Sequence, residues 1–323
     1  MAAACRVSRD EALARVCAAA RRDPPRDDGE ARRFLEIRFQ PELLAGDGLL
    51  TAYFAPQYEA REAPEPPFTA PVRPKPSALD DLLAAALADP GSDPTGPGPT
   101  APPPASPQAL PDRAAIEAQV ASDALAWMRP EDLFFLQIQG SGVLVLPDGR
   151  RLKAAFAASN NQPFVGLARL MREDGLIDDA HSSSEAIRAW LADHRGPEAD
   201  ALMRRDPRYV YFSVRPDDGR EPAGAAGIPL PAGRALAVDA ARHGMGELFW
   251  IDGEAPRLSG AFPRYQRLAA ALDVGGAIKG DIRADLYIGS GDVAGREAGR
   301  VRHVLRLYRL VPTTTFDDGL ARR

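Results

Sequence analysis

Four carboxylates stand among glycines between Leu272 and Asp292, and this segment holds the residue types best suited to chemistry. Glycine lets a backbone turn sharply and lets a ligand approach it closely. A carboxyl group in such a place can act as a general acid or base if burial or a neighbouring carboxylate raises its pKa. The segment therefore places carboxylates where a ligand could approach them, which makes it the most informative stretch of the sequence for a candidate site.

Residues 282–288 alternate between apolar and polar side chains, as a strand with two different faces does. The apolar face holds Ile282, Ala284, Leu286 and Ile288, and the polar face holds Arg283, Asp285 and Tyr287. Asp285 thus has a central place in a strand, where aspartate is disfavoured. This placement asks for a reason, and a functional carboxyl group would be one. The alternative interpretation is a solvated aspartate on an exposed strand.

The composition narrows the class of protein. The chain has 323 residues, enough for two domains, and its net charge of -5 argues against nucleic acid as a partner. Its four histidines fall in no metal-ligand spacing, so we expect neither a metal nor a cofactor. Its two cysteines, Cys5 and Cys17, are too few for a disulfide framework, and we interpret Cys17 as a small buried hydrophobic residue.

The N-terminal part of the chain predicts helices followed by a strand. Ser8 and Glu11 have the spacing of a capping box before an alanine-rich run to Arg22. A second helix is expected over residues 30–39, and a short strand over residues 49–54.

The middle of the chain mixes strand and helix signals. Between residues 132 and 156, apolar runs separated by Gly-Ser-Gly and Pro-Asp-Gly predict strands joined by tight turns, with 134–139 as the first strand. Helices are expected at 165–172 and, behind a capping box formed by Ser182 and Glu185, at 185–194.

Short apolar runs alternate with turns in the C-terminal third. Strands are expected at 210–214, 235–238, 248–251, 286–288 and 304–310. Such spacing suits a small closed β-barrel. The proline-rich segment 90–111 cannot bury enough apolar surface to offset the entropy of ordering, so we expect a flexible surface insertion there.

Several motifs resemble the membrane-bound lytic murein transglycosylase A family. Its C-terminal three-aspartate domain is similar to Asp273-Val-Gly-Gly-Ala-Ile-Lys-Gly280, Arg283-x-Asp285 and Gly289-x-Gly-Asp-x-Ala-Gly295. Further similar blocks are Leu50-Thr-Ala-Tyr-Phe-Ala-Pro56, Phe134-Phe-Leu-Gln-Ile-Gln-Gly-Ser-Gly142 and Asp206-Pro-Arg-Tyr-Val-Tyr-Phe212. The blocks keep the family's order along most of the chain.

The resemblance implies a mainly β fold with a few helices and two domains. Residues 1–54 and 222–323 would form a double-psi β-barrel that includes the N-terminal helices and carries the catalytic aspartate. Residues 55–221 would form an inserted, β-rich domain that binds substrate. A groove between the two domains would hold the glycan.

The resemblance also implies lytic transglycosylase activity, which cleaves the β-1,4 bond between N-acetylmuramic acid and N-acetylglucosamine and leaves a 1,6-anhydro sugar. Ordinary glycosidases need two carboxyl groups. Here the sugar's own 6-hydroxyl replaces water, so one carboxyl group can give a proton and then take one. The resemblance assigns this role to Asp285, with Asp239 and Asp273 in supporting or purely structural roles. Asp273 nearby would raise the pKa of Asp285, and Arg283 would lower it.

Other polar side chains are candidates for sugar contacts because they can stack on sugar rings or hydrogen-bond to hydroxyl and acetamido groups. They are Tyr53, Gln137, Gln139, Ser141 and Asn160. A structural role is the alternative for each. Lys279 is interpreted as a solvated or structural lysine. The glycines at 289–295 neither fit a dinucleotide loop nor precede a clear helix.

A glycan-binding protein without activity is the competing interpretation of the whole chain. In both interpretations the partner is peptidoglycan, and a monomer is expected. The substrate places the mature protein in the periplasm, and the family implies a lipid tether to the outer membrane. The chain itself shows neither the charged start nor the apolar run of a secretion signal.

Overall fold

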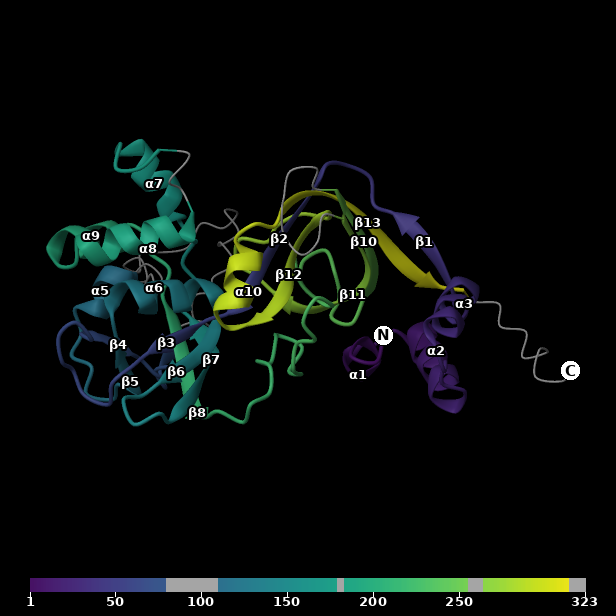
Figure 1. Cartoon of the computed structure of the whole chain (residues 1–323), viewed down its shortest axis with the longest axis horizontal. Helices are drawn as coiled ribbons and strands as arrows, with labels where there is room; N and C mark the ends of the chain where they lie inside the picture. The colour runs from purple at the N-terminus through teal and green to yellow at the C-terminus, as the bar shows by residue number, and fades with distance from the viewer. Residues whose placement is uncertain (80–109, 179–182, 255–263, 314–323) are drawn as a thin grey trace, which may run out of the picture. The chain divides into compact units, whose positions relative to one another are not determined.

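The computed structural model describes residues 1–79, 110–178, 183–254 and 264–313. The chain divides into two compact units (Figure 1). Met1–Pro56 and Gly219–Arg323 form the first, here called the barrel unit, and Gln57–Asp218 form the second, the insert unit. The proline-rich insertion predicted at 90–111 falls outside the described residues except at its last two positions.

A closed barrel of six strands forms the centre of the barrel unit. Its strands are β2 (Gly48–Ala55), β9 (Ala235–Val238), β10 (Leu248–Glu254), β11 (Arg264–Val274), β12 (Arg283–Ser290) and β13 (Arg302–Pro312). They are ordered β13-β10-β11-β9-β12-β2, and β2 pairs again with β13 to close the ring. The predicted mainly β fold with a closed barrel is therefore confirmed.

Apolar side chains fill the inside of the barrel. Leu50 of β2, Leu236 of β9 and both Ala284 and Leu286 of β12 belong to one buried cluster. Because side chains alternate along a strand, the residues between them lie on the outer face. Asp285 is therefore on the outside of the barrel wall, as the alternation in the sequence predicted.

Three helices precede the barrel strands: α1 (Ala4–Val7), α2 (Glu11–Arg22) and α3 (Asp28–Arg38). They contact β11, β13 and β1 (Phe39–Leu43), respectively, and β1 extends the barrel sheet beside β13. The predicted cap at Ser8 is wrong. Asp10 is the N-cap of α2, and its carboxylate accepts hydrogen bonds from the backbone N–H groups of Ala12 and Leu13.

The two cysteines form a disulfide between α1 and α2, which corrects the interpretation of Cys17 as a free cysteine that acts only as a hydrophobic residue. Cys17 is buried, as expected for a small hydrophobic residue, but its sulfur is bonded to that of Cys5. The pairing of helices in space brings the two residues together. The cysteine count alone could not show this.

Helix α10 (Gly291–Ala298) follows β12 directly and packs on both β2 and β12 (Figure 1). No clear helix was expected from the glycines at 289–295, and this expectation is wrong, because two of these glycines lie within α10. Gly295 lies on the packed face, where a Cβ atom would stand 2.7 Å from the Phe54 ring. The missing side chain at Gly295 therefore permits close packing of the helix against Phe54, rather than contact with a nucleotide.

The insert unit combines two small sheets with helices. One sheet has the order β3 (Gln57–Glu59), β6 (Ser141–Val145), β7 (Arg151–Ser159) and β8 (Val210–Pro216), and the other pairs β4 (Ala70–Val72) with β5 (Ala126–Met128). The helices are α5 (Arg113–Glu117), α6 (Pro130–Gln139), α7 (Leu167–Glu173), α8 (Ser184–Asp193) and α9 (Pro197–Met203). Helices α7 and α8 lie where helices were predicted. The N-cap of α8 is Ser183, and the predicted Ser182 lies outside the described residues.

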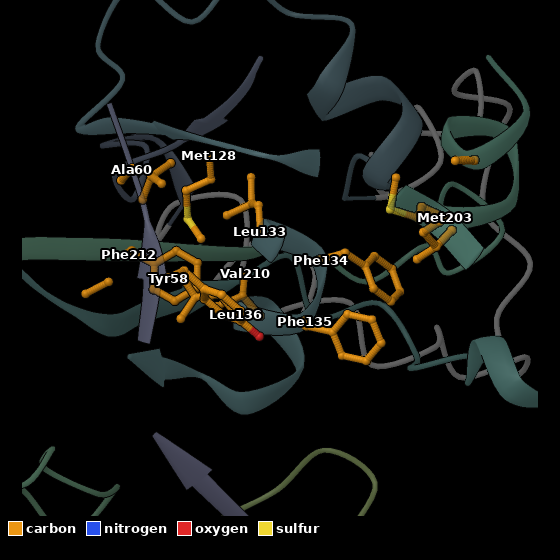
Figure 2. Close-up of a cluster of buried hydrophobic side chains, with 14 of the residues drawn as sticks. Tyr58, Ala60, Met128, Leu133, Phe134, Phe135, Leu136, Met203, Val210 and Phe212 are labelled. Atoms are coloured by element: carbon orange, nitrogen blue, oxygen red, sulfur yellow. The ribbon is translucent and has the colours of Figure 1, made fainter. Parts of the chain in front are cut away.

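Residues 134–139 form most of helix α6, so the strand predicted there is wrong. Pro130 occupies the first turn of this helix, and Gly140 ends it in a left-handed conformation with φ of 81°. These are the usual start and stop signals of a helix. The helix is buried on several sides: Leu133, Phe134, Phe135 and Leu136 all join the core of the insert unit (Figure 2). A short run whose residues are buried on most sides of a helix lacks the one-sided apolar spacing that separates helix from strand.

Candidate active site

The parallel pairing of β12 with β2 builds the centre of the candidate site. In this register Asp285 stands opposite Thr51, and Tyr287 stands opposite Tyr53. Directly opposed residues of neighbouring strands point to the same face. Two segments far apart in the sequence therefore supply one row of side chains on the outside of the barrel.

Asp285 is a partly buried carboxyl group with one oxygen engaged. Its Oδ1 accepts the hydroxyl hydrogen of Thr51 at 2.5 Å. Within the part of the chain that the structure describes, no hydrogen bond reaches Oδ2. Burial raises the pKa of Asp285 above its ordinary value, and the charge of Asp273 raises it further; the Thr51 hydrogen bond and the Arg283 charge act in the opposite direction. Both pKa influences expected from the sequence, Asp273 and Arg283, are confirmed.

Asp273 reaches the same face because β11 has a bulge. Ala271 of β11 pairs with Leu236, but Asp273 pairs with Ala237, so Leu272 is an extra residue between them. Without the bulge Asp273 would share the inward direction of Ala271. With it, Asp273 is in register with Ala237, which in turn pairs with Asp285 on the other side of β9.

Asp273 is held by three hydrogen bonds. Tyr53 donates its hydroxyl to Oδ2 at 2.7 Å, and the backbone N–H groups of Ala225 and Val274 donate to Oδ1, both at 2.9 Å. Burial raises the pKa of Asp273, and the three donors oppose that rise. Three donors are characteristic of a fixed carboxylate. The Tyr53 hydroxyl is thus directed at Asp273.

Asp239 has a different environment. Its carboxylate accepts the backbone N–H of Gly280 at 2.9 Å and that of Ala241 at 3.1 Å, and Lys279 lies 3.8 Å away. These bonds, led by that from Gly280, lower the pKa of Asp239. Asp239 therefore remains a carboxylate that fixes the turn at Gly280, three residues before β12 begins.

A further carboxylate, that of Glu221, lies at the far end of the row. It accepts hydrogen bonds from the hydroxyls of Tyr287 at 2.5 Å and Ser290 at 2.6 Å. The Tyr287 ring lies 5.3 Å from the Tyr53 ring, centroid to centroid. The two rings and their carboxylate partners thus form a rigid side to the site next to Asp285.

The remaining predicted residues belong to the insert unit, and two of them have engaged amides. Gln137 accepts from Arg113 at 2.6 Å and donates to the Val210 carbonyl at 3.1 Å. Asn160 is fully buried and donates to the carbonyls of Pro111 and Pro207. We assign both amides to holding backbone segments of this unit together.

Gln139 and Ser141 are placed differently. Gln139 ends α6 and Ser141 begins β6, and both side chains are partly exposed. Only Gly140 separates them, so they lie at one corner of the insert unit. The five residues predicted to contact sugar thus fall into three groups. Tyr53 lies beside Asp273, the amides of Gln137 and Asn160 are hydrogen-bonded within the insert unit, and Gln139 and Ser141 lie at this corner.

Thr51 and Arg283 also belong to the site. From the sequence we had assigned no role to Thr51, and to Arg283 only an effect of its charge on the pKa of Asp285. Arg283 donates to the Thr51 hydroxyl at 2.8 Å and to the Ala284 carbonyl at 2.6 Å. It also lines an open hollow of about 360 Å³ between the turns at 45–49 and 279–282. The alternation of β2 puts Thr51 and Tyr53 on one face, but only the pairing register brings Thr51 to Asp285.

Comparison with known proteins agrees with this architecture. Residues 49–213 match the family described as the MltA specific insert domain, and residues 234–311 match the 3D domain. A crystal structure of a membrane-bound lytic murein transglycosylase from Agrobacterium tumefaciens is 31% identical, with a TM-score of 0.77 over 93% of this chain and 84% of that one.

Two relatives carry the name membrane-bound lytic murein transglycosylase A. The protein from Vibrio cholerae is 30% identical over 272 residues, which cover 82% of this chain and 66% of that protein. The protein from Escherichia coli K12 is 34% identical over 209 residues, which cover 62% and 56%. The matched region thus spans just under two thirds of the first relative and less of the second. Within the described residues, no helix is both long and apolar enough to cross a lipid bilayer.

The family match covers both the inserted segment and the part of the barrel unit that contains Asp239, Asp273 and Asp285. It includes the β2 strand that supplies Thr51 and Tyr53. The chain belongs to the membrane-bound lytic murein transglycosylase A family.

Proposed function

We propose that this protein is a lytic transglycosylase that cleaves the β-1,4 bond between N-acetylmuramic acid and N-acetylglucosamine in peptidoglycan. The proposal depends above all on Asp285, a partly buried carboxyl group with a raised pKa and an unengaged Oδ2 among the described residues. The names of the relatives supply the reaction class. The geometry of Asp285 supplies a residue that can perform it.

In the first step Asp285 acts as a general acid. Its raised pKa keeps a fraction of the carboxyl groups protonated closer to neutral pH than an ordinary aspartate allows. The proton moves to the glycosidic oxygen as the bond from that oxygen to C1 of N-acetylmuramic acid breaks. N-acetylglucosamine leaves as an alcohol, and the bonding electrons stay with its oxygen.

In the second step the same carboxylate acts as a general base. It takes the proton of the 6-hydroxyl of N-acetylmuramic acid while that oxygen bonds to C1. The product is a 1,6-anhydro sugar, and Asp285 is protonated again for the next cycle. No water is consumed, so a second carboxyl group to activate water is unnecessary. In this proposal Asp273 and Asp239 support Asp285 by charge and by fixing the strands around it.

We further propose that the insert unit contributes to glycan binding. Gln139 and Ser141 remain our candidates there, because their side chains are partly exposed and can exchange hydrogen bonds with sugar hydroxyl and acetamido groups. Gln137 and Asn160 act in this proposal by holding the fold of the unit.

For location we propose the periplasm, with attachment to the outer membrane. The substrate lies outside the cytoplasmic membrane, and the relatives are named membrane-bound. The Cys5–Cys17 disulfide supports an oxidising compartment, since cytosolic thiols are normally kept reduced. A lipid could not occupy Cys5 while its sulfur is bonded to Cys17.

Digestion of purified peptidoglycan tests the proposed reaction. Soluble products analysed by mass spectrometry should contain 1,6-anhydro-muropeptides, and Asp285→Asn should reduce their release by roughly 100- to 10,000-fold, the usual contribution of a general acid or base. Asp281→Asn, at an exposed aspartate four residues away, is the matched control and should retain activity.

Two other outcomes would redirect the proposal. Products with reducing ends that carry an added water would indicate a hydrolase. Binding to peptidoglycan without any cleavage, unchanged by Asp285→Asn, would favour the competing interpretation of a glycan-binding protein.

A further inference from the structure

The Thr51 hydroxyl lies between a cation and the catalytic carboxyl group. Its oxygen is 2.8 Å from Nη2 of Arg283 and 2.5 Å from Oδ1 of Asp285. A hydroxyl has one hydrogen to donate and two lone pairs to accept with, whereas a guanidinium only donates. The bond to Arg283 must therefore use a lone pair of Thr51. The single hydrogen of Thr51 is left for Asp285.

These hydrogen bonds make the two carboxyl oxygens of Asp285 unequal. A proton on Oδ1 would compete with the Thr51 hydrogen that already points at that atom, so the hydroxyl would have to turn away and lose its bond. Turning is opposed because Arg283 holds the other side of the hydroxyl. Oδ2 meets no such donor among the described residues.

We propose that Thr51 and Arg283 are positioning residues that direct the catalytic proton to Oδ2 of Asp285. Arg283 orients the Thr51 hydroxyl, and Thr51 fixes the carboxyl group through Oδ1. The inference rests on the proposed function of Asp285 and deepens it, because it states which atom faces the glycosidic oxygen.

Arg283 is itself anchored well enough for this task. Its Nη1 donates to the carbonyl oxygen of Ala284 at 2.6 Å, so the two ends of its planar fork are bound at once. Burial lowers the pKa of Arg283 and the like charge of Arg302 lowers it further, while Asp285 opposes both. Arg302 is in register with Thr51 on β13, so it approaches the pair from the other neighbour of β2.

The charged and titratable groups around Asp285 set the direction of each effect. Arg283 on its own strand and Thr51 on β2 favour the carboxylate, whereas Asp273 on β11 disfavours it. Tyr53, also on β2, interacts with both carboxyl groups. When the proton leaves Oδ2, the Thr51 bond becomes charge-assisted and strengthens. Loss of this bond should therefore slow the acid step and favour the protonated form of the free enzyme.

The test compares Thr51→Val, which keeps the shape without the hydroxyl, with Thr51→Ser, which keeps the hydroxyl. One measurement is the kcat for anhydro-muropeptide release as a function of pH. The other is the ¹³C NMR titration of the Asp285 carboxyl group in aspartate-labelled protein, assigned with Asp285→Asn. Melting curves of each variant check folding.

Thr51→Val should lower kcat roughly 10- to 100-fold, the effect expected for a hydrogen bond to a charged group. Its Asp285 titration and the alkaline limb of its pH profile should both move to higher pH. Thr51→Ser should stay within a few-fold of the wild type in kcat and keep both titrations. Arg283→Met should also move the titration to higher pH, since it removes a cation and frees the Thr51 hydroxyl to rotate.

An unchanged Asp285 titration in both Thr51→Val and Arg283→Met would overturn the inference. So would equal losses of kcat in Thr51→Val and Thr51→Ser when both melt like the wild type. If Thr51→Val fails to fold, the Arg283→Met titration decides. In a further outcome, the wild type releases no anhydro product while the variants show the predicted titration shifts. This result would contradict the proposed function and leave the positioning of Asp285 supported.

Discussion

At the scale of single residues, the site holds a carboxyl group in surroundings that favour its neutral form. Burial of Asp285 is the largest cause of its raised pKa, and Asp273 adds to it. The ionised form is therefore less favourable in the folded protein than in the unfolded chain. The acid–base role that we propose for Asp285 would thus have a cost in folding stability, as is common at active sites.

Asp285→Asn should make the protein more stable at neutral pH. Asparagine resembles the protonated aspartate and still offers an oxygen to Thr51. Because the folded pKa is raised, the wild type loses stability as pH rises from the ordinary value of 3.8 through the folded value, and the variant does not. We therefore expect the melting temperature of the variant at pH 7 to lie above that of the wild type.

Melting curves from pH 3 to pH 8 check this prediction. The gap between variant and wild type should close as pH falls to the ordinary aspartate range. Asp281→Asn, at an exposed site, should change the melting temperature little at any pH. An Asp285→Asn variant less stable than the wild type at pH 7 would mean that the ionised form is well accommodated.

For the strands, the sequence predicted the side on which a residue lies better than the neighbouring strand with which it pairs. The alternation of residues 282–288 placed Asp285 on the polar side of a strand, and the structure agrees. Thr51 escaped notice because it lies 234 residues from Asp285 in the sequence and meets it only through strand pairing. Periodicity reports which way a side chain points, but register between distant strands is a property of the folded sheet.

Strand β11 was not predicted, and helix α6 was mistaken for a strand, for related reasons. The alanine-rich run in β11 favours a helix by intrinsic propensity, but pairing with β9 and β10 makes it a strand. Helix α6 is buried on most sides, polar residues such as Gln137 included, so its sequence does not show the one-sided apolar pattern of a surface helix. In both cases tertiary burial decides between alternatives that local signals leave open.

The bulge in β11 depends on close approach by Gly224. A Cβ atom on Gly224 would stand 2.5 Å from the Leu272 carbonyl oxygen, 2.6 Å from Leu230 and 3.2 Å from the Asp273 Cβ. Gly224→Ala should therefore displace Leu272 and Asp273 and break the bond from the Ala225 N–H. We expect a loss of about 1–3 kcal/mol, as for other overpacked sites, and at least a tenfold drop in activity.

Urea denaturation and anhydro-muropeptide assays on the same preparation measure the two effects. Gly227→Ala is a useful control, because this glycine has a φ of 73° but open space around it. It should show backbone strain without the clash and so lose stability with little change in kcat. Equal kinetic losses in both variants would show that the bulge is not what positions Asp273.

At the scale of the whole molecule, the N-terminal helices form part of the barrel unit's outer core. Ala4, Leu13 and Val16 are buried in one cluster with Leu272, the bulge residue next to Asp273. The Cys5–Cys17 disulfide joins the two helices that supply these side chains. Support for the site thus extends from the N-terminus to the strand that carries Asp273.

Removal of this disulfide should lower the stability of the protein. The cysteines are 12 residues apart in sequence, and closing a loop of this size contributes about 2–3 kcal/mol in the chain-entropy account. The double variant Cys5→Ser, Cys17→Ser should lose that amount of unfolding free energy in urea denaturation. The wild type should lose the same amount under reducing conditions. The reductant should not change the stability of the variant. Because the helices pack on Leu272, kcat should also fall by a few-fold in both. Two titratable thiols in the native, unreduced protein would contradict the pairing, and a reduced protein as stable as the oxidised one would show that packing alone holds the helices against the barrel.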